Sequence, residues 1–282
     1  MLRTLAAAVA LALASLMFPS MAANAETLAH RIDRLAPHFT VVRPDGEGPF
    51  PVVIMLHGCG GPRPMMPRWA EAMSEAGAAT ILVDSFAHRG ISRIAALSTV
   101  CTGAQLHGRE RAGDLYAAYA WARAQPWADA SRITAAGWSH GGWTVIDALA
   151  LRPGEEMARA TGLEDLPAEP LDGLAGAFLL YPYAGVASLA GRREWRLAPQ
   201  SLAIVSGRDY IVGSRTPLRA LERQVSRGAP IEIVVFETST HAFDDETAMH
   251  PQTRFDPEAT TRAQMLLRAL VERANAPPQP VR

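Results

Sequence analysis

The chain has 282 residues, of which 49% are hydrophobic and 20% are charged, and its formal net charge is −1. This is enough sequence for one sizeable buried core, so a single globular domain is the simplest expectation. The chain contains no basic run and no patch of interleaved basic and aromatic residues, which argues against nucleic acid and anionic membrane surfaces as partners.

The first 25 residues have the pattern of an export signal. Arg3 supplies a positive start, residues 5–18 form an apolar segment too short to span a bilayer comfortably, and residues 23–25 read Ala-Asn-Ala, a small-x-small cleavage site. We expect cleavage after Ala25 and a periplasmic or secreted mature protein, with no stable membrane span once the signal is removed. An uncleaved membrane anchor is the alternative.

Apolar runs suited to buried strands alternate with helix-like stretches through the rest of the chain. In chain order the pattern predicts an edge strand at 39–42, strand 51–56, helix 66–76, strand 79–83, helix 109–124, strand 133–136, helix 141–151, strands 176–181 and 202–205, helix 216–227, strand 231–236 and helix 257–275. This alternation predicts an α/β fold with a mostly parallel central sheet and helices on both faces.

The boundaries of the domain follow from the same pattern. We expect one domain over residues 26–275 and a frayed, proline-rich tail at 276–282. Two stretches that break the alternation, 152–172 and 184–199, are predicted to be surface excursions.

Ser139 lies in the sequence Gly-Trp-Ser-His-Gly at 137–141, between the predicted strand 133–136 and the helix that follows. A sharp strand-to-helix turn strains the serine backbone and requires glycine two residues before and after it, because a Cβ there would collide with the strand or the helix. The turn exposes the serine hydroxyl, so Ser139 is the predicted nucleophile.

A serine hydroxyl needs a base to remove its proton during attack, and histidine suits this role because its ordinary pKa is near neutrality. His241 directly follows the last predicted strand, at the edge of the sheet where ligands bind in parallel α/β folds. His57, His140 and His250 are weaker candidates, because the first two adjoin the predicted oxyanion donors and the third lies further into a polar loop.

The base in turn needs a carboxylate that orients it and stabilises the imidazolium. Asp209 follows a predicted buried strand and a glycine, so it is the predicted acid. Asp244 and Asp245 are adjacent to His241 in sequence and are expected to face solvent. The alternative role for Asp209 is to cap the predicted helix 216–227.

Backbone amides are the simplest donors for the negative charge of a tetrahedral intermediate. The amide of His140 follows the nucleophile, and the glycine-rich loop 57–61 supplies a second donor, for which Cys59 is preferred and Gly58 is the competitor. A plain strand-to-helix turn without this function is the alternative.

Cys59 and Cys101 are the two cysteines of the chain. An exported chain can oxidise them to a disulfide, and such a bridge would brace the predicted oxyanion loop. Two separate buried thiols are the alternative. Cys59 is a poor candidate nucleophile, because its glycine loop lacks the strained turn and a bridge would consume the thiol.

Several aromatic residues lie near the predicted site in sequence. Trp138, Tyr183, Tyr210 and Phe243 could form an apolar pocket for an acyl group, and ordinary core packing is the alternative for each. The chain has no zinc-binding His/Glu spacing, no phosphate-binding loop with its lysine and no dinucleotide fingerprint, so neither a metal nor a cofactor is expected.

Four segments carry a family resemblance: 57–61 (His-Gly-Cys-Gly-Gly), 83–90 (Val-Asp-Ser-Phe-Ala-His-Arg-Gly), 137–142 and 207–209. With Ser139, Asp209 and His241 in this chain order, the sequence resembles the α/β-hydrolase superfamily and, within it, the dienelactone hydrolase-like group. Dienelactone hydrolases proper carry a cysteine nucleophile where this chain has Ser139, so the resemblance implies a hydrolase and does not imply the dienelactone substrate.

The resemblance and the predicted triad together imply a serine hydrolase that acts on small carboxylic esters or lactones through an acyl-enzyme. A peptidase, a polyester depolymerase or a thioesterase would use the same residues. A non-catalytic binding protein on the same fold is a further alternative. The sequence contains no feature that determines the oligomeric state.

Overall fold

The structure is a computed structural model, and it describes residues 26–274. The expected signal at 1–25 and the expected tail at 276–282 lie outside the described residues.

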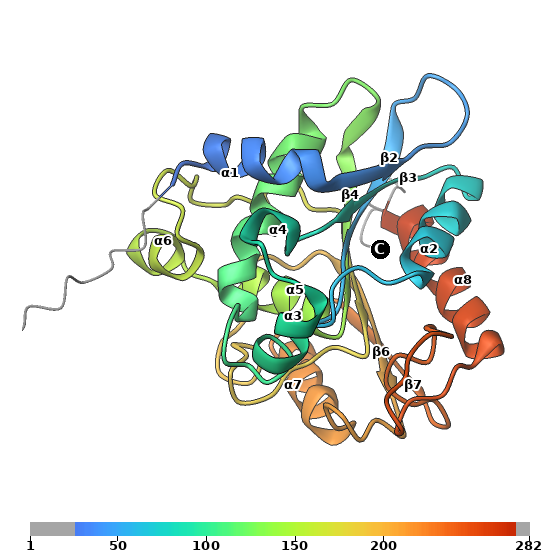
Figure 1. The fold of residues 1–282 in the computed structure, drawn as a ribbon. Coiled ribbons are helices and arrows are strands. Elements are labelled where there is room, and N and C mark those ends of the chain that lie inside the picture. Colours follow the sequence, from blue (N-terminus) through green and yellow to red (C-terminus); the bar gives the residue numbers. More distant parts are fainter. Residues whose placement is uncertain (1–25, 275–282) are drawn as a thin grey trace, which may run out of the picture.

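One mixed sheet forms the centre of the molecule (Figure 1). Its strands, in spatial order, are β1 (Phe39–Val42), β3 (Ala79–Val83), β2 (Phe50–Leu56), β4 (Ala128–Trp138), β5 (Gly176–Leu180), β6 (Gln200–Ser206) and β7 (Ile231–Phe236). All neighbouring pairs are parallel except the antiparallel pair β1 and β3 at the edge. The predicted fold class is therefore confirmed.

The longer helices match the predicted ones closely. They are α2 (Met65–Glu75), α4 (Gly108–Arg123), α5 (His140–Ala150), α7 (Arg215–Ser226) and α8 (Pro257–Ala274). The structure adds α1 (Leu28–Leu35), α3 (Arg93–Thr99) and α6 (Glu155–Thr161), together with the 3-10 turns at Ala36–His38 and Ala87–Arg89. The three additional helices have eight or seven residues, too few for an apolar period to stand out in the sequence.

Alternate residues of the central strands pack against helices on opposite faces. Val52, Ile54 and Leu56 of β2 join the core beneath α4 and α5, whereas Val53 and Met55 join the core beneath α2 and α8. Figure 1 shows α2 and α8 on one side of the sheet and α4 and α5 on the other. The sheet is thus buried on both faces, as continuous apolar strands require.

The two predicted surface excursions are partly buried, which corrects that expectation. Met157 of α6 and Leu171 belong to the core, as do Leu189 and Ala190 in the segment 184–199. Asp147 of α5 holds this second segment, since its Oδ1 accepts bonds from the Leu189 amide at 2.7 Å and from a neighbouring serine hydroxyl. The two segments are mostly polar, so the sequence gives no sign that these few residues are buried.

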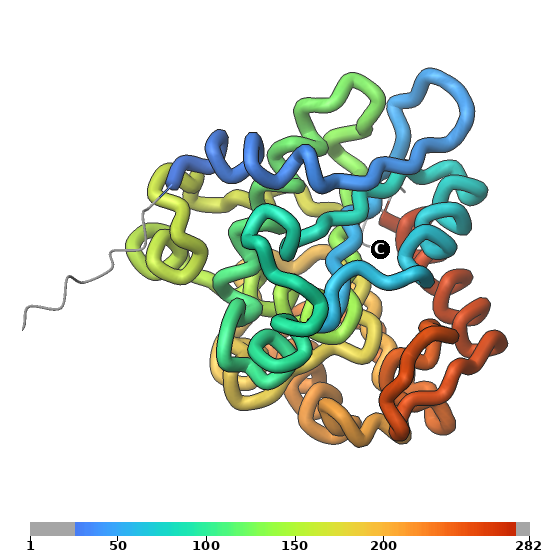
Figure 2. The backbone as a smooth tube through the Cα atoms, in the orientation of Figure 1, coloured from blue at the N-terminus to red at the C-terminus, as the bar shows by residue number. Residues whose placement is uncertain are grey.

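The loops that follow the parallel strands all emerge along the lower edge of the sheet in Figure 1, and Figure 2 traces the chain through them. Ligands of open parallel sheets bind at this edge. Within residues 26–274, every helix is too short or too polar to cross a bilayer.

Candidate active site

Ser139 occupies a strained turn between β4 and α5. Its φ of 51° and ψ of −108° lie outside the regions that side-chain-bearing residues prefer. A Cβ on Gly137 would come within 2.3 Å of the Gly141 backbone, and a Cβ on Gly141 would come within 2.0 Å of the Leu56 carbonyl oxygen. The two glycines therefore permit the close packing that this turn needs.

The side chains of Ser139, His241 and Asp209 lie together. The Ser139 hydroxyl is 2.9 Å from His241 Nε2, and His241 Nδ1 is 2.6 Å from Asp209 Oδ2. All three residues are buried, with 7%, 7% and 5% of their surface exposed. They come from the ends of β4, β7 and β6, so the sheet brings together residues that are far apart in sequence.

These hydrogen bonds define one protonation pattern. The hydroxyl donates to Nε2, and Nδ1 donates to a carboxylate whose other oxygen accepts the amides of Ile211 and Val212, each at 3.0 Å. A carboxylate held this way fixes the orientation and the tautomer of the ring. The arrangement is able to move a proton from a serine hydroxyl to an imidazole.

Three backbone amides near Ser139 have no acceptor among the hydrogen bonds of residues 26–274: those of Gly58, Cys59 and His140. The His140 amide is free because it opens α5, where the first amides have no intrahelical partner. A Cβ placed on Gly58 would lie 3.6 Å from the Ser139 Cβ, so the loop and the serine are in close proximity. Fixed amides beside a nucleophile can stabilise an oxyanion.

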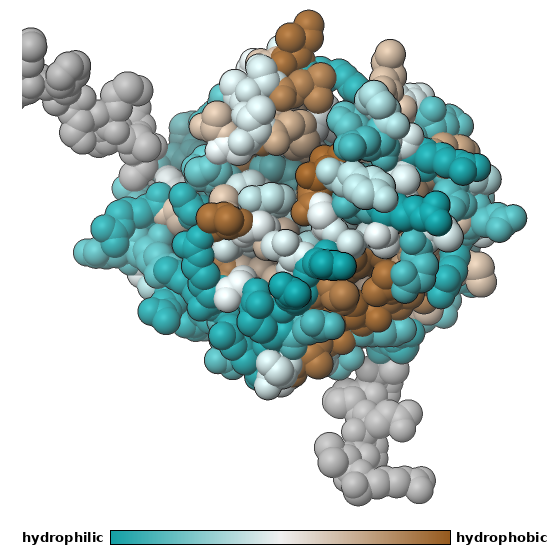
Figure 3. Space-filling model, turned by 90° about the horizontal axis from the view of Figure 1, so that it is seen from below, coloured by the Kyte–Doolittle hydropathy of each residue, from teal (hydrophilic) through white to brown (hydrophobic). Residues whose placement is uncertain are grey.

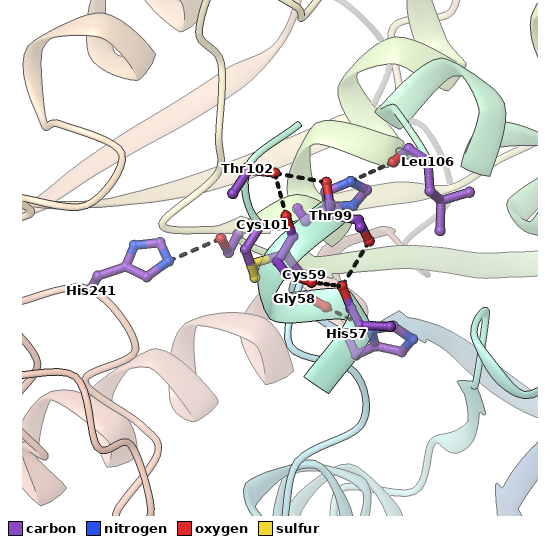
Figure 4. The surroundings of a disulfide bond; sticks show 12 residues. His57, Gly58, Cys59, Thr99, Cys101, Thr102, Leu106 and His241 are labelled. Atoms are coloured by element: carbon purple, nitrogen blue, oxygen red, sulfur yellow. Dashed lines mark hydrogen bonds between the residues drawn. A yellow bond between two sulfur atoms is a disulfide. The ribbon is translucent and has the colours of Figure 1, made fainter. Parts of the chain in front are cut away.

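Cys59 and Cys101 form a disulfide, with Cα atoms 5.0 Å apart. The bond joins the loop after β2 to the end of α3, and Figure 4 shows the His241 ring pointing toward this group of residues. The structure therefore has the disulfide and not two free thiols. The Cys59 sulfur is bonded to Cys101, so it is not available as a nucleophile.

A buried arginine links the two segments that carry the free amides. Arg111 of α4 donates from Nη1 to the His57 carbonyl oxygen at 2.7 Å and to His140 Nδ1 at 3.3 Å, and from Nε to the Ser85 hydroxyl at 2.8 Å. Burial lowers the pKa of Arg111 to about 9. Arg111 is not among the site residues predicted from the sequence; its one signal there is a basic side chain on the apolar face of a predicted helix.

The two other histidines of this region are buried and engaged in structural bonds. Burial lowers the pKa of His57 well below its usual value, and burial together with Arg111 lowers that of His140 to about 3. His140 Nε2 donates to the Leu106 carbonyl oxygen at 2.8 Å. Both rings are neutral near pH 7 and hold the loops in place.

Asp244 and Asp245 do not face solvent, which corrects the sequence expectation. Asp244 is fully buried and accepts bonds from Trp69 Nε1, Trp138 Nε1 and the Tyr181 hydroxyl at 2.9, 2.9 and 2.6 Å. Asp245 pairs with Arg63 at 2.7 Å. Neither carboxylate is bonded to His241.

Tyr181 lies between Asp244 and the histidine. Its ring centroid is 4.7 Å from that of His241, and burial raises the pKa of its hydroxyl well above the usual value. Its φ of 36° shows that the backbone bends sharply after β5. Asp244 therefore supports the His241 ring indirectly, through the tyrosine.

Two of the four predicted pocket residues are core residues. Trp138 and Phe243 are 1% and 0% exposed, so no surface of theirs is available to a ligand, and the packing alternative holds for them. Tyr183 is half-buried and its amide donates to the Ser139 carbonyl oxygen at 3.1 Å. Tyr210 is 70% exposed beside Asp209.

The sequence matches one family model in part. The prolyl oligopeptidase family matches over residues 101–155, a segment that includes α4, β4 and the Ser139 turn. No curated protein matches this chain.

Solved structures match over most of the chain. A structure assigned as a dienelactone hydrolase from Klebsiella pneumoniae subsp. pneumoniae has 17% identity and a TM-score of 0.64, covering 83% of this chain and 92% of its own. Esterase 2 of Thermogutta terrifontis, with butyrate bound, has 16% identity and a TM-score of 0.60, covering 86% and 91%.

A dienelactone hydrolase-like promiscuous phosphotriesterase from metagenomic libraries has 20% identity and a TM-score of 0.57, covering 84% of this chain and 99% of its own. The chain therefore has the α/β-hydrolase fold, and its structural neighbours include dienelactone hydrolase-like proteins and esterases. At these identities the likeness concerns the fold.

Proposed function

We propose that this protein is a serine hydrolase that cleaves carboxylic esters or lactones through an acyl-enzyme. The observation that carries the proposal is the continuous chain of hydrogen bonds from Ser139 through His241 to Asp209, beside unpaired backbone amides. The fold of the structural neighbours, esterases and dienelactone hydrolase-like proteins, supports the same class.

In the first half-reaction the Ser139 hydroxyl oxygen attacks the ester carbonyl carbon while His241 Nε2 takes the hydroxyl proton. The negative charge then rests on the former carbonyl oxygen, where the amide of His140 and that of Cys59, or of Gly58 in its place, donate to it. The bond to the alcohol oxygen breaks as His241 returns its proton to that oxygen, and the acyl group remains on the serine.

In the second half-reaction a water molecule attacks the acyl carbon and gives a proton to His241. The bond to the Ser139 oxygen breaks, the serine recovers the proton, and the carboxylic acid leaves. Asp209 stabilises the imidazolium in both halves because it accepts the Nδ1 hydrogen bond.

A peptidase is the second candidate, because the prolyl oligopeptidase family model matches the segment that contains Ser139. Ester and peptide hydrolysis use the same residues and differ in the leaving group. We favour esters because the esterase structure covers 86% of this chain, whereas the peptidase family model matches only residues 101–155.

Labelling with a fluorophosphonate probe tests the proposal. The probe should react covalently with the wild-type protein and not with Ser139→Ala, while the two proteins have the same circular dichroism spectrum. Labelling of the variant at the wild-type rate would remove Ser139 from the mechanism. Lack of labelling in the wild type, with no hydrolysis of esters, lactones, thioesters or peptides, would favour the non-catalytic binding protein.

We also propose that the protein is exported and cleaved after Ala25. The disulfide between Cys59 and Cys101 supports this, because such bonds persist in oxidising compartments. Mass spectrometry of protein recovered from the producing cell should give an amino terminus at Glu26. An intact terminus on a membrane-bound protein would favour the anchor instead.

A further inference from the structure

We propose that His57 is a positioning residue for the oxyanion: its ring holds the carbonyl oxygen of Gly58 and so aims the amide of Cys59, which belongs to the same peptide group. This inference rests on the proposed hydrolase function and adds a residue to the same site. It also selects Cys59 over Gly58 as the second oxyanion donor. It is carried by the hydrogen bonds made behind the loop 57–61.

The candidate donor at His140 shows how such an amide is held. A peptide group is planar and trans, so its carbonyl oxygen and its N–H point in opposite directions. The carbonyl oxygen of this peptide group, that of Ser139, accepts the amides of Trp143 at 3.0 Å and Tyr183 at 3.1 Å. Bonds to the oxygen fix the direction of the N–H, and they make it a stronger donor because linked hydrogen bonds polarise one another.

The peptide group between Gly58 and Cys59 has the same arrangement. Its carbonyl oxygen, that of Gly58, is 2.7 Å from His57 Nδ1 and accepts the Gly61 amide at 3.2 Å. The disulfide holds the side chain of Cys59 on the other side of the peptide group. The Cys59 amide, which has no acceptor within residues 26–274, is therefore held from both sides and left free to bond an oxyanion.

The surroundings of the His57 ring decide which of its nitrogens carries the hydrogen. The Ser85 amide, which can only donate, lies 3.3 Å from Nε2, so Nε2 accepts and Nδ1 carries the hydrogen that reaches Gly58. The carboxylate of Asp84 is 3.9 Å from Nε2, too far to accept a hydrogen bond from it. Burial lowers the pKa of His57 well below its usual value, so the ring stays neutral and its donor is fixed.

The His57 ring acts on the loop and not on the substrate. His57 is 1% exposed, and its ring packs against that of Phe86 with the centroids 4.6 Å apart. In Figure 4, Gly58 and Cys59 lie between the rings of His57 and His241. Figure 3 views the face on which the loops of the site emerge, and a ring this deeply buried is not accessible from it.

The Gly58 amide, the competing donor, is supported differently. The carbonyl oxygen of its peptide group, that of His57, accepts a bond from Arg111 Nη1 at 2.7 Å, and the same nitrogen also lies 3.3 Å from His140 Nδ1. The His57 ring is bonded to the other peptide group, that of Cys59. Loss of the ring's donor should therefore weaken an oxyanion donor at Cys59 and leave one at Gly58 in place.

Two substitutions separate the two nitrogens of the ring. In His57→Asn the side-chain nitrogen is as many bonds from Cβ as Nδ1, so it can donate to Gly58, whereas the Ser85 amide loses its acceptor. In His57→Gln the side-chain oxygen is as many bonds from Cβ as Nε2, so it can accept the Ser85 amide, whereas the bond to Gly58 is lost. Each variant loses one hydrogen bond, and the two differ in which one.

His57→Gln should lower kcat on p-nitrophenyl acetate by about tenfold, a part of the 10²- to 10³-fold loss that removal of a whole oxyanion donor causes. KM should stay nearly unchanged, because the oxyanion exists only in the transition state and the intermediate. His57→Asn should keep nearly the wild-type kcat. Steady-state kinetics measure these values, with active sites counted by titration with a fluorophosphonate.

A trifluoromethyl ketone gives a second measurement that does not depend on the amount of folded enzyme. The Ser139 oxygen bonds to the ketone carbon, the serine proton passes to His241, and the electron pair of the C=O bond stays on the oxygen as an oxyanion. The inhibition constant should rise in His57→Gln by the factor by which kcat falls, and should change little in His57→Asn. A role limited to stability would lower Tm and leave the inhibition constant unchanged.

His88→Asn and His88→Gln are the matched controls. The His88 side chain is also buried, at 3% exposed, and within residues 26–274 it has no hydrogen bond to the loop 57–61. Both controls should keep the wild-type kcat and inhibition constant. His57→Leu also lacks the donor and should show the same loss of kcat as His57→Gln, so the comparison with His57→Asn does not depend on the folding of one variant.

Equal kcat values for His57→Asn and His57→Gln, or a larger loss in His57→Asn, would overturn the proposal. The proposed hydrolase function fails separately. It is contradicted if the wild type neither reacts with the fluorophosphonate nor hydrolyses an ester. If the wild type does both and the His57 variants behave alike, only the role of His57 is contradicted.

Discussion

Single side chains define the chemistry of the site, and their roles differ even among neighbours in sequence. Asp209 and Asp244 are both buried carboxylates near His241. Asp209 is bonded to the imidazole, whereas Asp244 is bonded to two indoles and a phenol. The hydrogen-bond partners, not the residue type, therefore separate the candidate acid from a structural carboxylate.

Asp209→Asn should lower kcat by about 10³- to 10⁴-fold and leave KM nearly unchanged, because the amide favours the wrong imidazole tautomer. Steady-state kinetics on p-nitrophenyl acetate would measure this. Asp245→Asn is the control, since this carboxylate is bonded to Arg63 and not to His241. A larger loss of kcat for Asp245→Asn than for Asp209→Asn would show that Asp209 is not the acid.

Arg111→Lys should lower kcat by about tenfold or more with a smaller change in KM. Lysine places its donors on a single nitrogen and cannot reproduce the planar group through which Nε reaches Ser85 while Nη1 reaches the His57 carbonyl oxygen and His140. The loops that carry the candidate oxyanion donors should therefore lose their alignment. Arg123→Lys, at the exposed end of the same helix, is the matched control. Equal kcat values for the two variants would show that Arg111 has no positioning role.

At the scale of elements, short connections hold the loops of the site against the helices. The disulfide joins the loop after β2 to α3. Asp147 of α5 holds the segment 184–199 through the Leu189 amide and the Ser188 hydroxyl. Each connection depends on one or two side chains, so substitutions at those positions can test it.

The variant Cys59→Ser with Cys101→Ser should be less stable by about 4 kcal/mol, since the bridge closes a separation of 42 residues and limits the unfolded chain. It should also lose turnover, because the Cys59 amide is a candidate oxyanion donor. Urea denaturation and esterase kinetics measure the two effects. Wild-type kcat in a destabilised variant would show that the bridge stabilises the fold without positioning the donor.

Asp147, on α5, should make the free energy of unfolding of the protein depend on pH. Burial raises its pKa from 3.8 to about 6, so between these values the native state keeps a proton that the unfolded state has lost. The contribution of the protonated group to stability is therefore complete below about pH 4 and is lost as the pH rises through 6.

Relative to Asp147→Asn, which does not titrate, the wild-type free energy of unfolding should fall by up to about 3 kcal/mol between pH 4 and pH 7. Urea denaturation of both proteins at intervals of one pH unit would measure the difference. Parallel curves for the two proteins would contradict the raised pKa.

On the scale of the whole molecule, one sheet connects two cores. Ile54 packs beneath α4 and α5, and the next residue, Met55, packs beneath α2 and α8. Because every central strand contributes to both cores, neither core can lose its packing while the other remains intact. One domain over residues 26–275 stays a prediction, and this sharing provides a way to test it.

Ile54→Ala and Met55→Ala should each lower the free energy of unfolding by about 2–5 kcal/mol, because both side chains are fully buried. The far-ultraviolet circular dichroism and tryptophan fluorescence transitions should still coincide in urea. Two separate transitions, each sensitive to one of the substitutions, would show that the chain unfolds as two independent units.

The amino-acid sequence by itself determined the fold class, the order of the longer elements, the Ser139 turn and the approach of Ser139, Asp209 and His241. These properties follow from local apolar periods, from glycines that a turn requires, and from the rule that the carboxyl ends of parallel strands share one edge. The short helices α1, α3 and α6 were missed because their local pattern is too brief.

Only the tertiary structure decided which polar residues are buried and which aromatic residues can reach a ligand. Asp244 contacts Trp69 and Trp138, which are 175 and 106 positions away, and Arg111 meets His57 across 54 positions. No local pattern encodes such pairs, since each depends on how helices and loops from distant parts of the chain pack around the same end of the sheet. The formation of the disulfide was decided for the same reason.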